Sequence, residues 1–196
     1  MDHLQACAKA FERLLDIKYH IVIGRKGKST ELNILFDPTE FHHLVGLHKL
    51  HDLRLARGNR EKIFRQILSG EISMDDLKKS QYFSSIQKRI EPFHEIENFL
   101  DSNNLIFRYN KKLQTFSLIE AEYLLSTPYE STDIYIFLDH QNEPDCFFCR
   151  SFFPKEDKDY TKGQAVYTLL KKEKITISTG KTVVQYDRLT PKQKAE

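Results

Sequence analysis

The sequence predicts an α+β fold in which N-terminal helices and a β-hairpin pack on a mostly antiparallel sheet from the C-terminal half of the chain. Three observations support this prediction. Apolar residues recur at helical spacing through most of residues 1–103. From Leu105 onward they alternate instead, in runs rich in aromatic and β-branched side chains. The stretches between these runs are short and turn-forming, and short connections favour antiparallel pairing.

The composition is that of an ordinary folded domain. The chain has 196 residues, of which 40% are hydrophobic and 30% charged, and its formal net charge is +2. We expect one domain over residues 1–189, helix-rich in 1–103 and sheet-rich in 104–189, with a frayed tail at 190–196. No apolar run approaches the length of a membrane span and the start is not signal-like. We therefore expect a cytoplasmic protein without a membrane partner.

The first segment combines a helix and a hairpin. Apolar residues at helical spacing predict an amphipathic helix over about Asp2–Asp16. Ile17–Gly24 and Glu31–Phe36 then alternate between apolar and polar residues, which predicts a β-hairpin. The hairpin tip is basic, and it is either a contact for a nucleic-acid backbone or a solvated face. The cations concerned are Arg25, Lys26 and Lys28.

The stretch FHHLVGLHKLHDLR, from Phe41 to Arg54, holds half of the eight histidines. Asp37-Pro38 is a good helix entry, and we expect the helix that follows to end by Leu53. His48 falls among apolar side chains on one face of that helix, and burial depresses the pKa of a histidine. Three interpretations stay open for His48: a core histidine, a general acid or base, or a metal ligand. No HExxH pattern or cysteine cluster accompanies it, so we assign no metal site.

Two further segments carry cations that suit a phosphate. The loop after the histidine helix holds Arg54 and Arg57, with a solvated connector as the alternative. On the expected strand Val166–Lys174, hydroxyl and ammonium groups alternate between two faces, and such groups donate to a phosphate. Lysines on an edge strand that only prevent aggregation are the alternative. The side chains concerned are Tyr167 and Lys171 on one face and Thr168, Lys172 and Lys174 on the other.

The remaining elements follow from the same patterns. Helices are expected at Ile63–Leu68, after a cap at Ser73, and over Ser84–Leu100 with a break at Pro92. The segment Glu120–Leu125 is compatible with a strand or a helix. Strands are expected at Leu105–Tyr109, Thr115–Ile119, Asp133–Leu138, Phe147–Phe153, Val166–Thr176 and Thr182–Tyr186.

Several sequence blocks occur in an order that marks a family. They are AFERLLD, GRKGKSTELNILFD, FHHLVGLHKLHD, REKIFRQILSG, NNLIFRYNKK, FSLIEAEYLL, DIYIFL, and YTLLKKEKI with a TGK turn, and they span about Ala10 to Leu189. Together they resemble the phage-type members of the barnase/EndoU/colicin/RelE-like nuclease superfamily, class four. The long helical insertion between the histidine helix and the sheet departs from a minimal nuclease domain. A resemblance of this kind carries over a fold more safely than an activity.

The resemblance implies a metal-independent endoribonuclease of toxin or effector type, encoded by a phage or conjugative element. A general base takes the ribose 2′-hydroxyl proton, the oxygen attacks the phosphate, an acid protonates the leaving 5′-oxygen, and cations stabilise the charge. On this sequence the resemblance assigns acid and base to His48 or His43, charge stabilisation to Arg54 or Arg57 and Lys171, and phosphate positioning to Tyr167 or Thr168.

RNA is the expected partner, an immunity or other protein partner is a further candidate, and no cofactor is implied. The RNA contacts are expected at Arg25, Lys26, Lys28, Arg57, Lys172 and Lys174. Two alternatives stay open: a non-catalytic RNA- or protein-binding module of the same fold, and a metal-dependent hydrolase that uses His48, His51 and Asp52.

Overall fold

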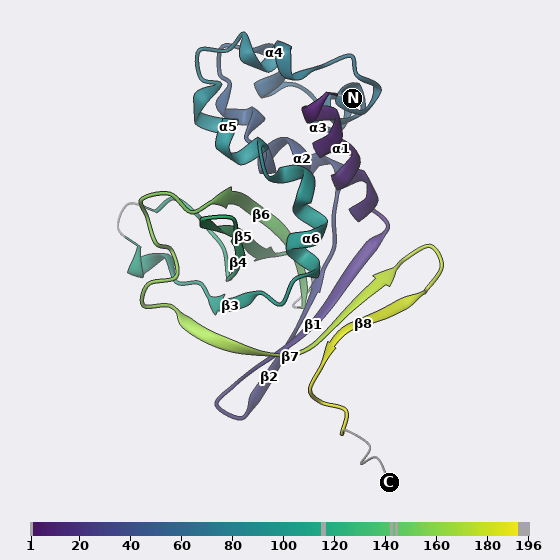
Figure 1. Cartoon of the computed structure of the whole chain (residues 1–196), viewed down its shortest axis with the longest axis vertical. Helices are drawn as coiled ribbons and strands as arrows, with labels where there is room; N and C mark the ends of the chain where they lie inside the picture. The colour runs from purple at the N-terminus through teal and green to yellow at the C-terminus, as the bar shows by residue number, and fades with distance from the viewer. Residues whose placement is uncertain (1, 115–116, 142, 144, 192–196) are drawn as a thin grey trace.

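The computed structural model describes residues 2–114, 117–141, 143 and 145–191, and it places a helical lobe against one end of a strongly curved sheet (Figure 1). The lobe lies at the top of Figure 1 and is built from segments on both sides of the first hairpin. Its helices are α1 (His3–Leu14), α2 (Pro38–Leu44), α3 (Arg60–Ser69), α4 (Met74–Lys78), α5 (Ser84–Ile90) and α6 (Ile96–Asp101). Within the described ranges, no helix combines the length and the apolar character needed to cross a membrane.

The helix boundaries follow local signals in the sequence. Asp2 caps α1 by accepting hydrogen bonds from two backbone amides, so the predicted first helix is confirmed. Asp37 caps α2 by accepting a hydrogen bond from the backbone amide of Thr39. Gly70 ends α3 in a left-handed conformation (φ 84°). The predicted break at Pro92 is confirmed, because it separates α5 from α6.

The strands form one sheet that closes on itself. They are β1 (Ile17–Arg25), β2 (Lys28–Ile34), β3 (Leu105–Arg108), β4 (Tyr123–Tyr129), β5 (Thr132–His140), β6 (Cys146–Pro154), β7 (Ala165–Thr176) and β8 (Thr182–Asp187). The order β1-β2-β6-β5-β4-β3-β7 returns to β1 and makes a closed barrel, and β8 pairs on the outside of this ring with β7. The pairing of β2 with β6 is parallel, and the other described pairings are antiparallel.

The α+β class and the mostly antiparallel pairing are confirmed, but the sheet takes in the first hairpin and closes into a barrel, which the sequence did not predict. Closure depends on β7, a strand of 12 residues. It pairs with β3 through Ala165–Tyr167 and with β1 through Thr168–Thr176, and it thereby joins the first hairpin to the C-terminal strands. Alternation in a sequence identifies a strand and its two faces, but it does not name the partners of that strand.

Three other predicted segments have different outcomes. Of the predicted strand Thr115–Ile119, residues 115 and 116 lie outside the described residues, and 117–119 form no strand. The ambiguous segment Glu120–Leu125 contributes the start of β4, from Tyr123 onward. Of the tail that was expected to fray, residues 192–196 lie outside the described residues.

One hydrophobic core joins the lobe to the interior of the barrel. Phe11 and Phe93 from the lobe are buried in the same cluster as Ile136 and Phe152 from the barrel. The rings of Phe93 and Phe152 meet edge to face with their centroids 4.9 Å apart, which ties the lobe directly to β6. The lobe and the barrel therefore share a core, and the burial of apolar surface in it stabilises their contact.

Lys172 of β7 lies inside this core with 0% of its surface exposed. Its ammonium donates to the carbonyl oxygens of Leu100 (2.6 Å) and Ser102 and to Oδ1 of Asn104 (3.0 Å). Lys172 thus donates to two carbonyl groups at the C-terminal end of α6, where a helix lacks intrahelical donors. The predicted RNA contact through Lys172 is wrong, because a side chain without exposed surface does not reach a nucleic acid.

Candidate active site

The histidine segment turns back on itself instead of forming one long helix. α2 ends at Leu44, and Gly46 follows with a left-handed φ of 86°. A Cβ at Gly46 would lie 2.8 Å from Cγ2 of Ile86, so glycine is needed for the turn to pack on α5. A short 3-10 turn over Leu47–Lys49 comes next. The predicted helix that continues to Leu53 is therefore wrong.

This turn stacks two histidines on each other. His43 at the end of α2 and His48 in the 3-10 turn have ring centroids 4.2 Å apart and an interplanar angle of 11°. Both side chains are partly buried and line the same pocket. Nδ1 of His48 is buried without a hydrogen-bond partner in the part of the chain that the structure describes. His43 and His48 are the predicted acid and base residues that the structure brings together.

The two imidazoles are neutral at neutral pH. Burial, together with the positive charges of Arg89 and Arg150, lowers the pKa of His43 to about 4. Burial, together with His43 and Arg89, lowers the pKa of His48 to about 3. A neutral imidazole is able to accept a proton, which is the state that a general base requires.

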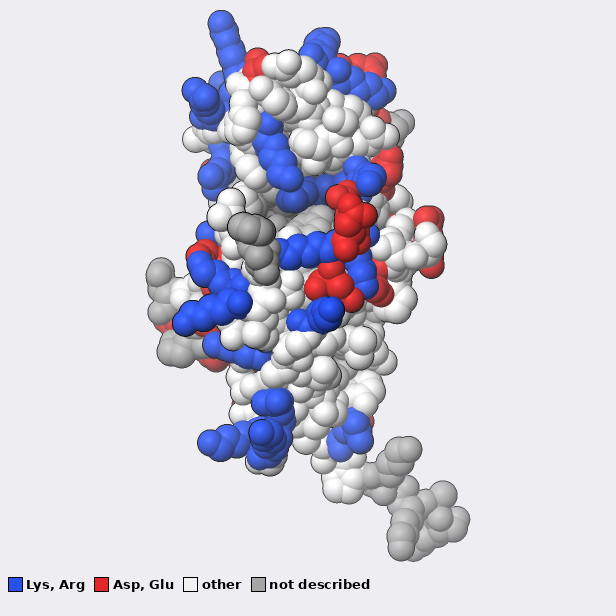
Figure 2. Space-filling view, turned by 90° about the vertical axis from the view of Figure 1, so that its left-hand side faces the viewer, with Lys and Arg blue, Asp and Glu red and all other residues white. Residues whose placement is uncertain are grey.

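The histidine pair opens into a pocket of about 960 Å³ where the lobe meets the barrel. One wall comes from α5 and the 3-10 turn, and the facing wall comes from β6 and the segments 117–120 and 156–160. Figure 2 looks onto this side and shows a hollow between the helices and the sheet, bordered by basic side chains and, at one side, by acidic ones. The ionisable side chains of the pocket are His43, His48, Lys49, Lys88, Arg89, Glu120, Arg150, Glu156, Asp157, Lys158 and Tyr160.

The charge of the pocket is dominated by cations on the lobe side. Lys88 is ion-paired with Glu156 (3.3 Å). Arg89 is only 9% exposed, and its guanidinium lies over the ring of Phe153, 5.4 Å from the centroid. Burial lowers the pKa of Arg89 to about 10, so the group stays charged at neutral pH. A neutral base beside a fixed cation is suited to reactions in which negative charge develops.

The other residues predicted to be catalytic lie elsewhere. Arg54 and Arg57 are exposed in a 3-10 turn (Arg54–Arg57) and do not line the pocket. Tyr167 packs against the main core. Lys171 is ion-paired with Glu173 (2.7 Å) on its own strand. The structure therefore does not bring the β7 residues to the histidine pair.

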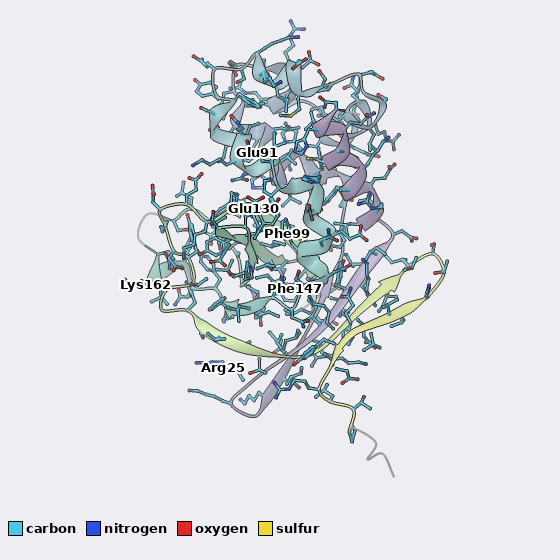
Figure 3. All side chains as sticks on the ribbon, in the orientation of Figure 1. Arg25, Glu91, Phe99, Glu130, Phe147 and Lys162 are labelled. Atoms are coloured by element: carbon cyan, nitrogen blue, oxygen red, sulfur yellow. The ribbon has the colours of Figure 1, made fainter. Side chains whose placement is uncertain are left out.

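A second basic site lies at the tip of the first hairpin, where Lys26 and Gly27 have φ values of 52° and 76° and form a tight two-residue turn. The tip borders a groove of about 500 Å³. Figure 3 shows Arg25 at the lower end of the molecule, far from Glu91, which directly follows α5. The groove is lined by Gly24, Arg25, Lys26, Gly27, Lys28, Ser29, Thr168, Leu170 and Arg188, and none of these described residues is acidic.

Some side chains predicted to bind RNA or a metal ion instead form ion pairs or hydrogen bonds within the protein. Lys174 is ion-paired with Glu97 and Asp101, each at 2.8 Å, and is not part of the hairpin groove. The carboxylate of Asp52 accepts hydrogen bonds from Oγ of Ser80 (2.5 Å) and from the amide of Gln81. Within residues 2–114, 117–141, 143 and 145–191, no three His, Cys, Asp or Glu side chains gather as a metal-binding group.

Two arginines of the pocket are not among the site residues that the sequence predicts. Arg89 lies three residues after Ile86 and directly before Ile90, so it falls on the buried side of α5. A cation on an apolar helix face is a signal that sequence inspection can find. Arg150 lies on β6, and no local pattern connects that strand with the histidine segment.

Comparisons with known proteins give one match. A family model described as phage-Barnase-EndoU-ColicinE5/D-RelE like nuclease4 matches residues 3–189. No curated protein and no solved structure matches the chain. The family match covers nearly all of the 196 residues and agrees with the resemblance of the sequence blocks. The chain therefore belongs to the phage-Barnase-EndoU-ColicinE5/D-RelE like nuclease4 family.

Proposed function

We propose that this nuclease is an endoribonuclease whose chemistry takes place in the histidine pocket. The observation that carries the proposal is the stacked, neutral pair of His43 and His48 in the wall of a basic pocket. Arg54, Tyr167 and Lys171 lie outside this pocket and are left out of the proposed catalytic set.

In the proposed reaction the chain's own side chains move the protons. His48 accepts the proton of the ribose 2′-hydroxyl, and the oxygen attacks the adjacent phosphorus. His43, protonated in the complex with the anionic substrate, gives a proton to the leaving 5′-oxygen. Cations of the pocket stabilise the negative charge of the transition state. The products are a 2′,3′-cyclic phosphate and a 5′-hydroxyl end, and the sequence of steps uses no metal ion.

We further propose that the hairpin groove binds the RNA backbone outside the scissile position. Arg25, Lys26, Lys28 and Arg188 are exposed there, and Thr168 adds a hydroxyl donor. Such groups bind phosphates electrostatically and without regard to base sequence. Lys172 and Lys174 are not part of this proposed interface, because their ammonium groups already have protein partners.

The test is cleavage of single-stranded RNA by purified protein in the presence of EDTA, with the product ends identified. The wild type is expected to leave 2′,3′-cyclic phosphates, and His48→Ala is expected to lose at least about 100-fold in kcat/KM. The matched control is His51→Ala, because His51 is exposed, contacts Tyr82 and does not line the pocket. Full activity of His48→Ala would reject the assignment of His48.

Two other results would replace the proposal. Activity that EDTA abolishes and a divalent ion restores would indicate a metal-dependent hydrolase. Salt-sensitive RNA binding without any product would indicate a non-catalytic binding module.

We also propose a biological role as a toxin or effector of a mobile element, with an immunity protein as its partner. The support is the word phage in the description of the family. Expression in a bacterial host is expected to arrest growth and to degrade RNA, whereas His48→Ala is expected to do neither. Normal growth during accumulation of active wild-type protein would contradict this role.

A further inference from the structure

Arg89 is a buried cation without a counter-ion of its own. It is 9% exposed, and its guanidinium contacts the ring of Phe153. Within the described part of the chain it makes no hydrogen bond and no ion pair. Glu156 acts on it electrostatically, but that carboxylate is ion-paired with Lys88 (3.3 Å). No residue of the described part of the chain therefore accepts a hydrogen bond from the five N–H donors of the guanidinium.

A buried charge without a partner costs free energy unless a ligand neutralises it. The same pocket holds Arg150 and Lys49, and both residues add positive charge near the histidine pair. Burial and Arg89 lower the pKa of Lys49, in agreement with an excess of positive charge there. An anion bound against Arg89 would neutralise this excess and would accept the free N–H groups.

We propose that the pocket contains a phosphate-binding site anchored by Arg89, with Arg150 and Lys49 as further donors. The planar guanidinium suits this ligand, because it donates two parallel hydrogen bonds to a pair of phosphate oxygens. A pocket of about 960 Å³ has room for the phosphate and for the nucleosides attached to it. The inference rests on the proposed function, in which the bound group is the scissile phosphodiester, and free inorganic phosphate offers the same chemistry.

The site gives Arg89 a measurable effect on the histidines. The charged or titratable groups that act on His48 are His43, Arg89, Lys49 and His42, and each of them lowers its pKa. A phosphate bound beside Arg89 introduces negative charge and is expected to raise the pKa of His48 by about one unit or more. Arg89 therefore acts on phosphate directly and on the proton state of His48 indirectly.

The test compares the wild type with Arg89→Met and Arg89→Lys, by calorimetric titration, thermal unfolding and NMR titration of the histidine rings. Phosphate is expected to raise the Tm of the wild type and to bind at least about tenfold more weakly to Arg89→Met. Arg89→Lys keeps the positive charge but lacks the planar guanidinium, and its phosphate affinity is expected to lie between those of the wild type and Arg89→Met. The control is Arg65→Met, because Arg65 is exposed on α3 and ion-paired with Glu61.

Stability without any anion separates a binding role from a structural one. A structural arginine would lower the Tm when replaced, whereas loss of an unpaired buried charge is expected to leave the Tm of Arg89→Met unchanged or higher. The proposal is overturned if Arg89→Met binds phosphate as tightly as the wild type does. It is also overturned if wild-type Tm and histidine signals do not respond to any phosphate probe.

Two probes identify the source of the phosphate. Inorganic phosphate represents the free ion, and a 2′-deoxy dinucleotide represents a phosphodiester that has no attacking hydroxyl. Tighter, Arg89-dependent binding of the dinucleotide supports the RNA backbone, and tighter binding of inorganic phosphate supports the free ion. If phosphate binds in an Arg89-dependent manner but the protein does not cleave RNA, the nuclease proposal fails and the phosphate site stands. If the protein cleaves RNA in a His48-dependent manner but phosphate binding does not depend on Arg89, the phosphate site fails and the nuclease proposal stands.

Discussion

At the scale of single residues, two buried cations have opposite surroundings. The ammonium of Lys172 donates to three oxygens of the protein, whereas the guanidinium of Arg89 has no such acceptor in the described part of the chain. Burial lowers the pKa of Lys172 to about 8, so the group is charged at neutral pH. Satisfied donors indicate a structural role for Lys172, and free donors facing a pocket indicate a ligand for Arg89.

Replacement of Lys172 by methionine is expected to lower the free energy of unfolding by about 2–4 kcal/mol, because three oxygens of Leu100, Ser102 and Asn104 lose a charged donor. Urea unfolding of the purified variant measures this change. Lys171→Met is the matched control, because the neighbouring lysine is partly exposed and pairs only with Glu173 among the described residues. Equal losses for both variants would contradict a special role for Lys172.

The histidine pair makes stability depend on pH. The ordinary pKa of 6.5 falls to about 4 for His43 and to about 3 for His48, chiefly by burial. As pH decreases from about 6.5 toward 4, the unfolded chain binds protons that the folded protein does not, and the free energy of unfolding decreases. The stabilising contribution of the two neutral histidines is fully present above their ordinary pKa of 6.5. It is lost as the pH falls toward their pKa values in the folded protein.

The variant His43→Gln/His48→Gln is expected to lose less stability than the wild type between about pH 7 and pH 5, in a phosphate-free buffer. Burial raises the pKa of Glu40 to about 8, which gives the opposite pH dependence, but Glu40 is common to both proteins and cancels in the difference. His51→Gln is the control, because that ring is exposed. Parallel pH profiles for the wild type and the double variant would refute the prediction.

At the scale of elements, the turn at Gly46, which follows α2 and packs on α5, determines whether the site forms. Gly46 takes a conformation that other residues adopt only with strain, and it packs on Ile86 of α5. The turn places His48 over His43, and α5 carries Arg89 into the same pocket. Backbone geometry at one glycine therefore aligns the proposed base with the proposed phosphate anchor.

Replacement of Gly46 by alanine is expected to cost about 1–3 kcal/mol of stability and to reduce RNA cleavage by at least about tenfold. The reasons are the strain of a positive φ and a contact of 2.8 Å with Ile86. Gly180→Ala is the control, because Gly180 has φ 68° with no atom within 4 Å of the added Cβ. Thermal unfolding and kcat/KM are the measurements. Equal behaviour of the two variants would show that the contact with α5 does not matter.

At the scale of the whole molecule, the closed barrel separates two basic regions. The histidine pocket lies where the lobe meets β6, and the hairpin groove lies at the C-terminal end of β1, where Figure 3 labels Arg25. Both regions depend on closure, because β7 supplies Thr168 to the groove and completes the ring that carries β6. An RNA chain long enough to reach both regions would bind in the pocket and in the groove. A dinucleotide would bind in the pocket alone.

Neutralisation of the hairpin tip in Arg25→Gln/Lys26→Gln/Lys28→Gln is expected to reduce the slope of log K against log salt for single-stranded RNA by about 2. Cleavage of a dinucleotide, which is too short to reach the groove, is expected to fall far less than cleavage of long RNA. Arg65→Gln/Lys78→Gln/Lys79→Gln removes the same charge from ion-paired positions on α3 and at the C-terminal end of α4 and is the control. An unchanged slope in the hairpin variant would exclude the groove from RNA binding.

Local interactions make part of this protein predictable from its sequence. Caps, turn residues and periodicity act within a few residues of each other, so α1, the first hairpin, the break at Pro92 and most strands are predictable. The sequence blocks indicated the nuclease family, and the histidine segment drew attention to His43 and His48.

The way these parts meet depends on long-range packing. Closure of the barrel through β7, the stacking of two imidazoles and the burial of Lys172 and Arg89 arise from contacts between segments far apart in the chain. Such contacts depend on register and on packing, and a local pattern specifies neither. Alternation along β7 shows which side of the sheet a lysine faces. It does not show whether that side contacts RNA or a hydrophobic core, because burial is a property of the assembled fold.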